Sequence, residues 1–229
     1  MLPGFIPVLW NAGFSPTTIT YNSGSGTETV PAGATSCRIR IWGGGGSGGN
    51  AAGNGGGGGG GGFSEKTVTV NSGDQINYVV GAGGARRISS SVGAGSAGDL
   101  SRVGNLTATG GFTGTSMLAN GGNAGTQVGG GAGGTASGGT TNTTGGNQSG
   151  GTGGTAGGTG GGAGGTYSIA SYDSDLMQWI VTQVATNGSS PGGGGGGGKF
   201  VESSLSNNFT EYHDPSGAGS SGRVEFYYT

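Results

Sequence analysis

The chain has 229 residues, of which 65 are glycine and only 8% are charged, and its formal net charge is −2. Scarce proline and the missing G-X-Y repeat exclude collagen, and the small net charge is not typical of disordered chains. There is no basic excess to support nucleic-acid binding, and no run of about 18 apolar residues that could span a membrane.

Alternating apolar and polar residues predict half-buried β-strands near both ends of the chain. In 35–42, Cys37, Ile39 and Ile41 occupy one face of the expected strand. The same alternation recurs in 63–70, 74–80 and 222–229. A turn of sequence NSGD makes 63–80 a candidate β-hairpin. Such strands are typical of antiparallel sheets, so we expect a mainly β fold whose sheet or sandwich is formed by both chain ends.

Two uninterrupted glycine runs, 55–62 and 192–198, separate these strand patterns. Glycine lacks a Cβ, so extended glycine segments can approach closely and hydrogen-bond sideways. In the polyproline II conformation eight residues span roughly 25 Å, about the length of a seven-residue strand. The runs therefore predict packed, polyglycine-II-like segments beside the sheet. The alternative is a pair of flexible spacers.

A third glycine-rich tract predicts the same conformation at about 120–166. Between Gly130 and Gly160, glycine occupies most of the positions spaced by three, which is the polyproline II period. The exceptions are Ala136, Asn142 and Gln148. This spacing predicts one buried glycine edge, with Thr, Ser and Asn projecting outward. A solvated Gly/Thr linker is the alternative.

One short helix is expected at 174–186. Leu176, Ile180 and Val184 recur at i, i+4 and i+8, Asp173 precedes them as a candidate cap, and Asn-Gly follows as a stop signal. Such a helix would pack against one end of the core or stand, with Tyr172 and Trp179, at a binding tip.

These segments together resemble a known family. The stretches "TETVPAGATSCRIRIWGGGGSGG" (27–49), "FSEKTVTVNSGDQINYVVGAGG" (63–84) and "GAGSSGRVEFYYT" (217–229) resemble the glycine-rich domain of bacteriophage tail-fibre and receptor-binding proteins. The middle resembles, more loosely, the distal adhesins of T-even-like phages. In those adhesins polyglycine-II helices pack in a sandwich and the loops between them recognise the host. The resemblance implies a virion protein that recognises a host cell.

Motifs for catalysis and cofactors are incomplete. The chain has one histidine, His213, and one cysteine, Cys37, so it lacks a nucleophile with its base. The GAGSAG sequence at 93–98 is not followed by a helix pattern, and Phe200 replaces the Ser or Thr of a phosphate-binding loop. We expect no enzymatic activity, no cofactor and no metal. Two distant carboxylates acting as a glycosidase pair stay an open alternative.

Candidate receptor-binding residues come from three segments interpreted as loops, 105–118, 167–191 and 203–221. Aromatic side chains beside Asn, Ser and Thr suit the recognition of sugars and protein surfaces. Burial in the core is the alternative for each of them. The candidates are Phe112, Tyr167, Tyr172, Trp179, Phe209, Tyr212 and His213.

The expected organisation has two parts. Residues 1–26 form an N-terminal segment, whose apolar stretch 2–10 is a candidate anchor for other virion proteins, and 27–229 form one glycine-rich β domain. We expect a receptor-binding tail fibre or adhesin in the virion tail or a surface appendage. Its partner would be a host cell-surface glycan or an outer-membrane protein, and homo-oligomerisation is left open. The alternatives are a purely structural spike, cement or baseplate protein, and an ice-binding protein displaying threonine arrays.

Overall fold

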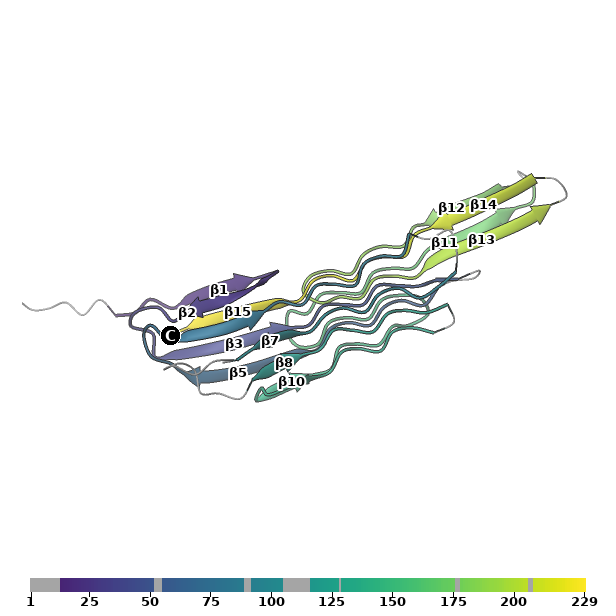
Figure 1. Cartoon of the computed structure of the whole chain (residues 1–229). Helices are drawn as coiled ribbons and strands as arrows, with labels where there is room; N and C mark the ends of the chain where they lie inside the picture. Colours follow the sequence, from purple (N-terminus) through teal and green to yellow (C-terminus); the bar gives the residue numbers. More distant parts are fainter. Residues whose placement is uncertain are drawn as a thin grey trace, which may run out of the picture.

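Three zones follow one another along an elongated molecule (Figure 1). The proximal end holds β-sheets beside the C-terminus, the middle is a bundle of wavy extended segments, and the tip at the opposite end consists of two hairpins. The structure is a computed structural model that describes residues 13–51, 55–88, 92–104, 116–127, 129–175, 178–205 and 208–229.

Two antiparallel sheets form the proximal end. The first contains, in spatial order, β1 (Thr17–Tyr21), β15 (Arg223–Tyr228), β3 (Ser36–Trp42), β5 (Phe63–Thr69) and β10 (Thr141–Thr143). The second contains β2 (Ser25–Thr29), β6 (Gln75–Val79), β7 (Ser101–Val103), β8 (Met117–Ala119) and β9 (Ala136–Ser137). The expected mainly β fold is confirmed, and β15 beside β3 shows that both chain ends share one sheet.

The hairpin predicted at 63–80 is wrong, although its turn forms. Gly73 has a φ of 82°, and the Asn71 N–H donates to Asp74 Oδ2 at 2.8 Å. The turn connects the two sheets: β5 pairs with β3 and β10, whereas β6 pairs with β2 and β7. Alternation shows which face of a strand is buried but not which strand lies beside it. Here β5 pairs with β3 along the whole length of both strands, and β6 covers the core from the second sheet.

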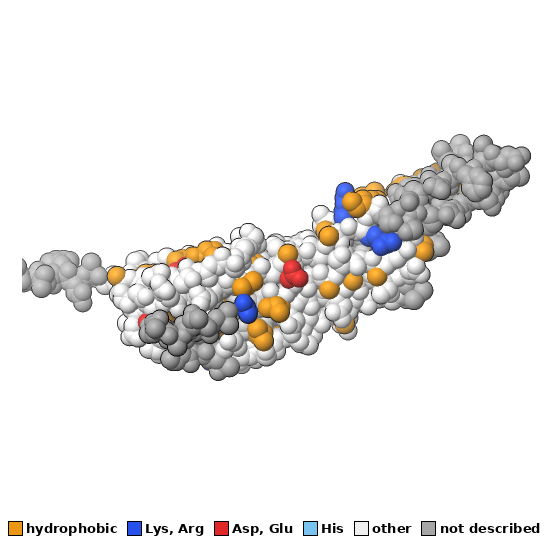
Figure 2. All heavy atoms as spheres, in the orientation of Figure 1, with side chains coloured by type: hydrophobic (Ala, Val, Ile, Leu, Met, Phe, Trp, Pro, Cys, Tyr) orange, Lys and Arg blue, Asp and Glu red, His pale blue; other side chains and the backbone are white. Residues whose placement is uncertain are grey.

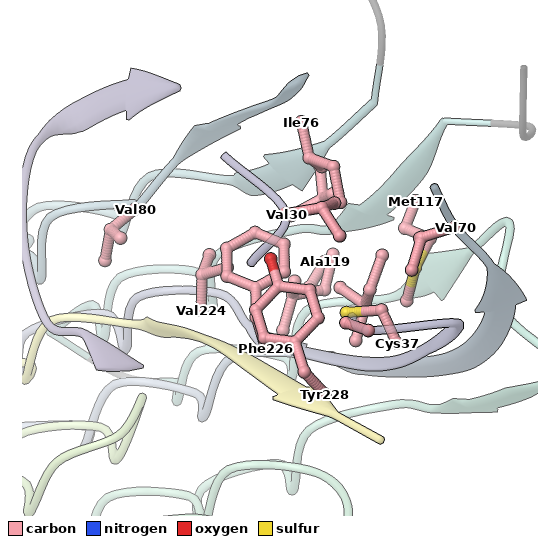
Figure 3. Packing of buried hydrophobic residues seen from close by; sticks show 14 residues of the cluster. Val30, Cys37, Val70, Ile76, Val80, Met117, Ala119, Val224, Phe226 and Tyr228 are labelled. Carbon is pink, nitrogen blue, oxygen red and sulfur yellow. The ribbon is translucent and has the colours of Figure 1, made fainter. Parts of the chain in front are cut away.

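The hydrophobic core lies between the two sheets (Figure 3). Cys37, Ile39 and Ile41 are fully buried, as the alternation predicted. Phe226 from β15 and Met117 from β8 meet them from the neighbouring strand and the opposite sheet, and both are 0% exposed. Burying large apolar side chains contributes about 1.5–3 kcal/mol each, so this cluster stabilises the proximal end.

A carboxylate is buried inside this core. Glu28 is 5% exposed and accepts hydrogen bonds from Tyr21 Oη at 2.6 Å and from Tyr228 Oη at 3.2 Å. The bond to Glu28 is the main cause that raises the pKa of Tyr21, whereas burial is the main cause that raises the pKa of Tyr228. Burial also raises the pKa of the Cys37 thiol to about 12. Each group thus keeps its proton more firmly in the folded state.

Stability is therefore expected to fall at alkaline pH. The unfolded Cys37 thiol ionises near pH 9.0, whereas the folded thiol stays protonated until about 12. Its contribution is fully present below about pH 9 and is lost as the pH rises toward 12, at about 1.4 kcal/mol per pH unit. Urea unfolding of wild type and Cys37→Ala at several pH values measures this slope. The slope should be shallower in the variant; equal slopes would show that Cys37 does not contribute.

Hydrogen bonds in the bundle repeat every three residues. The segment 43–49, which continues β3, donates in turn to three different neighbours, and three residues per turn is the polyproline II period. The donor and acceptor pairs are Gly43 N–H to Gly62 O, Gly44 to Asp99, Gly45 to Ser220, Gly46 to Gly59, Ser47 to Ser96, Gly48 to Gly217 and Gly49 to Gly56, all between 2.9 and 3.1 Å.

Three mutually bonded segments form the centre of the bundle: 43–49, 55–62 and 192–198. They are buried along their whole length. Nine further segments surround them among the described residues: 81–88, 92–100, 120–126, 129–135, 144–148, 152–157, 162–168, 184–189 and 215–222. The two glycine runs are thus structural and ordered, which rules out flexible spacers. They continue the strands end to end rather than lying beside the sheet.

Side chains in the outer segments point away from the centre. In 120–126, Asn120, Asn123 and Thr126 are exposed, whereas Gly122 and Gly125 are buried. The tract at 129–166 follows the same rule, and its Thr135, Thr144, Thr155 and Thr166 are exposed as predicted. It does not form one continuous glycine edge, because turns divide it into separate antiparallel crossings; Gly158 and Gly160 of one such turn have φ of 71° and 80°.

The helix predicted at 174–186 is also wrong. This region forms β11 (Ile169–Asp173) and β12 (Gln178–Gln183), which pair as an antiparallel hairpin. A spacing of four residues fits one face of a strand as well as one face of a helix, because four is an even number. The β-branched residues of "IVT" (180–182) favour the strand. Asp173 still caps a turn, since its Oδ1 accepts the Asp175 N–H at 2.9 Å.

Candidate functional site

The tip contains two hairpins that project from the far end of the bundle (Figure 1). The first is β11–β12. The second is formed by β13 (Gly198–Leu205) and β14 (Asn208–Asp214), and the short β4 (Asn50–Ala51) pairs with β13 in parallel. Each hairpin continues two bundle segments: 162–168 and 184–189 enter the first, and 192–198 and 215–222 enter the second. The tip is therefore held by four anchored chain segments.

Polar contacts fix the base of the tip. Lys199 Nζ donates to Ala170 O at 2.5 Å, which links the two hairpins. Asp214 is 7% exposed, and its Oδ2 accepts the Ala185 N–H at 3.0 Å. Gln183 Nε2 donates to Tyr167 O at 2.6 Å. The bonds of Lys199 and Asp214 join one hairpin to the other, and the bond of Gln183 closes the base of the first hairpin, so the two hairpins are held in place relative to each other.

Six of the seven candidate aromatic and histidine residues gather at this end. Tyr167 is half-buried in the segment that leads into β11. Tyr172 of β11 lies opposite Trp179 of β12, and its hydroxyl oxygen is buried. Phe209, Tyr212 and His213 lie on β14, in register with Ser204, Val201 and Phe200 of β13.

Phe112 falls outside the described residues. The strands nearest to it in sequence, β7 and β8, belong to the proximal sheet at the other end of the molecule. The segment 203–221, interpreted as a loop, is also corrected, because β13 and β14 run through much of it.

The list of candidate site residues left out the exposed aliphatic residues near the tip, although a binding tip was one of the two roles considered for this segment. Ile169, Ile180, Val181 and Val184 are 38%, 36%, 38% and 56% exposed. The helix interpretation placed Ile180 and Val184 on a packing stripe. The alternation expected of a strand, with neighbouring residues on opposite faces, was the signal that could have found them.

Among the described residues, no three His, Cys, Asp or Glu side chains lie close enough to hold a metal ion. In the same part of the chain no helix is long and apolar enough to cross a membrane.

Two hollows of modest size lie outside the tip's strands. One of about 250 Å³ is lined by Tyr78, Arg102 and Ser116 on the second proximal sheet. The other, of about 280 Å³, lies among Gly55, Gln148 and neighbouring glycines. Neither is lined by a carboxylate, histidine or cysteine that could act as acid, base or nucleophile. Figure 2 shows Lys and Arg side chains next to hydrophobic ones at the end of the bundle that carries the tip.

Comparison with known proteins agrees with a glycine-rich scaffold. The chain belongs to the glycine-rich domain family, whose model matches residues 20–229, so the match includes the proximal sheets except for the start of β1, the bundle and the tip. No curated protein matches the sequence.

Proposed function

We propose that the protein is a non-enzymatic bacteriophage adhesin, a receptor-binding tail-fibre protein that presents its tip to the host cell surface. One observation supports this most: the bundle holds the two hairpins apart from the proximal sheets, one of which contains the C-terminal strand β15. A rigid spacer with a protruding end suits a protein attached at one end and binding at the other. The sequence resemblance to phage receptor-binding proteins points the same way.

The rest of the proposal concerns the surroundings of the protein. It would be located in the virion, in the tail or another exposed appendage, with other virion proteins holding its proximal end. Residues 2–10, which lie outside the described residues, are the proposed anchor. The partner at the tip would be a host glycan or an outer-membrane protein. The proposed phage origin rests on the sequence resemblance and not on the fold.

The purified chain is expected to attach to intact bacteria through the tip. Replacing Tyr212 and His213 by alanine should weaken attachment by more than about 1 kcal/mol, roughly fivefold, as aromatic hot spots commonly do. Tyr227→Ala is the matched control, because Tyr227 lies on β15 at the proximal end, with its ring 5.1 Å from the Arg38 guanidinium. Cell-binding isotherms over a panel of strains, with circular dichroism to verify folding, measure the difference.

Two results would count against the adhesin. If no strain binds the wild type, or if Tyr227→Ala impairs attachment as much as the tip variant, the tip is not a receptor-binding site. A purely structural virion component would then be the better explanation, and the protein should be found within the virion without affecting adsorption.

A further inference from the structure

The outer face of the second proximal sheet contains the hollow of about 250 Å³. Val79 of β6 and Leu118 of β8 lie directly opposite Arg102 of β7, so the three side chains share one face. That face points away from the core, because the alternate residues Val103 and Met117 are buried in the core. Arg102 is exposed and the two aliphatic side chains are half-buried. A cation therefore stands between two apolar walls.

The next row of residues along these strands adds hydrogen-bond donors to the hollow. Gly104 lies between Asn77 and Ser116 and leaves a gap there, since an added Cβ would lie 2.7 Å from Ser116 Oγ. Asn77 Oδ1 already accepts the Thr27 hydroxyl at 2.7 Å, so the Asn77 amide group offers its Nδ2 as a donor. The side chains of Asn77 and Ser116 both line the hollow. An amide, a hydroxyl and a guanidinium thus supply donors beside apolar walls.

Arg102 has no acidic partner within the described residues, where its guanidinium forms neither an ion pair nor a hydrogen bond. The five strands of this sheet contain one other charged residue, Glu28, which faces the core and binds two tyrosine hydroxyls there. Residues 105–115, which follow β7 in the sequence, include no charged residue. The hollow therefore presents a positive charge that the sheet and this segment do not neutralise.

We propose that this hollow binds an acidic side chain of a neighbouring protein, an Asp or Glu flanked by aliphatic residues in an exposed peptide segment. A carboxylate only accepts hydrogen bonds and pairs well with Arg, so the charge and the donors favour it over cationic or neutral groups. Val79 and Leu118 would cover the aliphatic neighbours. A nucleic acid, with a phosphate at every nucleotide, would meet only one cation on this sheet.

The size and the place of the hollow favour a protein partner. Its volume of about 250 Å³ is below the range of roughly 300–1,000 Å³ that is typical of small-molecule pockets, so one or two inserted side chains suit it better than a cofactor. It lies at the proximal end, away from the tip. The inference rests on the proposed function, in which other virion proteins hold this end.

The test titrates the peptide acetyl-Leu-Glu-Leu-amide into the isotope-labelled full chain and follows the backbone amides by NMR. The uncharged acetyl-Leu-Gln-Leu-amide is the matched probe. The acidic peptide should shift the signals of Val79, Arg102 and Leu118 in a saturable way and bind about fivefold more tightly than the neutral one, and added salt should reduce this preference. Arg102→Gln should abolish the preference. Arg86→Gln should keep it, because Arg86 is exposed on a bundle segment.

Three results would overturn the proposal: no saturable shift at this sheet, equal binding of the two peptides, or a preference that survives Arg102→Gln. The receptor-binding function would stand, since attachment of Arg102→Gln to cells through the tip is expected to equal that of wild type. A dimer that Arg102→Gln abolishes, seen by analytical ultracentrifugation, would replace the neighbouring protein by a second copy of this chain. Failure of the wild type to attach to any strain would overturn the receptor-binding function and leave the peptide result unchanged.

Discussion

Replacing Gly58 by alanine is expected to unfold the protein or to lower its free energy of unfolding by about 4 kcal/mol or more. Gly58 lies in the central segment 55–62, where its N–H donates to Gly195 O and its carbonyl accepts the Gly154 N–H, both at 2.8 Å. A Cβ there would overlap the Gly46 carbonyl and lie 2.7 Å from Ser47 O. Because all of these neighbours are backbone, none can move aside as a flexible side chain would.

Gly129→Ala is the matched control for this substitution. Gly129 belongs to an outer segment, and the nearest atom to its added Cβ would be Thr126 Oγ1, at 3.4 Å. This variant should unfold like wild type or slightly later, since alanine reduces the entropy of the unfolded chain. Chemical denaturation followed by circular dichroism compares the two. If Gly58→Ala is insoluble, amide hydrogen exchange of wild type at Gly55–Gly62 gives an independent measurement, and exchange at random-coil rates would falsify the packed bundle.

Trp42→Ala is expected to destabilise the protein by about 3–5 kcal/mol, as truncations of buried tryptophan commonly do. Trp42 is 1% exposed and ends β3 where the bundle begins. Its ring centroid lies 5.0 Å from that of Phe63, the first residue of β5, and 4.8 Å from the Arg40 guanidinium. The pair covers the junction between sheet and bundle, so truncation should loosen both.

Trp42→Phe is a more conservative substitution at the same junction. Trp42 Nε1 has no hydrogen-bond partner within the described structure, so phenylalanine loses area but no bond. We expect a distinctly smaller loss of stability than for alanine. Amide hydrogen exchange is measured separately in the sheets and in the bundle as the temperature is raised. It shows whether the substitution destabilises both zones. Destabilisation confined to the sheets would contradict the role of Trp42 as a link.

The glycine content of a segment turned out to indicate its depth in the bundle. Segments 55–62 and 192–198 have glycine at every position and lie at the centre, because a Cβ in any direction would meet backbone. In 120–126 only the inward positions need glycine, so Asn and Thr occupy the others. The sequence could therefore predict that these two segments are central, although the third central segment, 43–49, also holds the buried Ser47. It could not predict their neighbours, because glycine has no side chain with which to specify one.

The errors at the tip have a different origin. The spacing of Ile180 and Val184 satisfies both a helix and a strand, and the β-branched residues together with the attachment to two bundle segments select the strand. Asn, Pro and Gly in "NNFTEYHDPSG" suggested a loop, although Phe209 and Tyr212 are strand-forming residues. Six candidate residues nevertheless lie together at the tip, because the two hairpins that contain them connect bundle segments at that end.

The three-residue period also limits how this chain can change in length. Inserting one residue within 55–62 would rotate everything after it by a third of a turn, so each N–H that faces 192–198 would face another segment instead. An insertion of three residues restores the direction but requires the same addition in every bonded neighbour. Insertions and deletions in the bundle are thus expected in multiples of three residues, whereas the hairpins at the tip are not under this constraint.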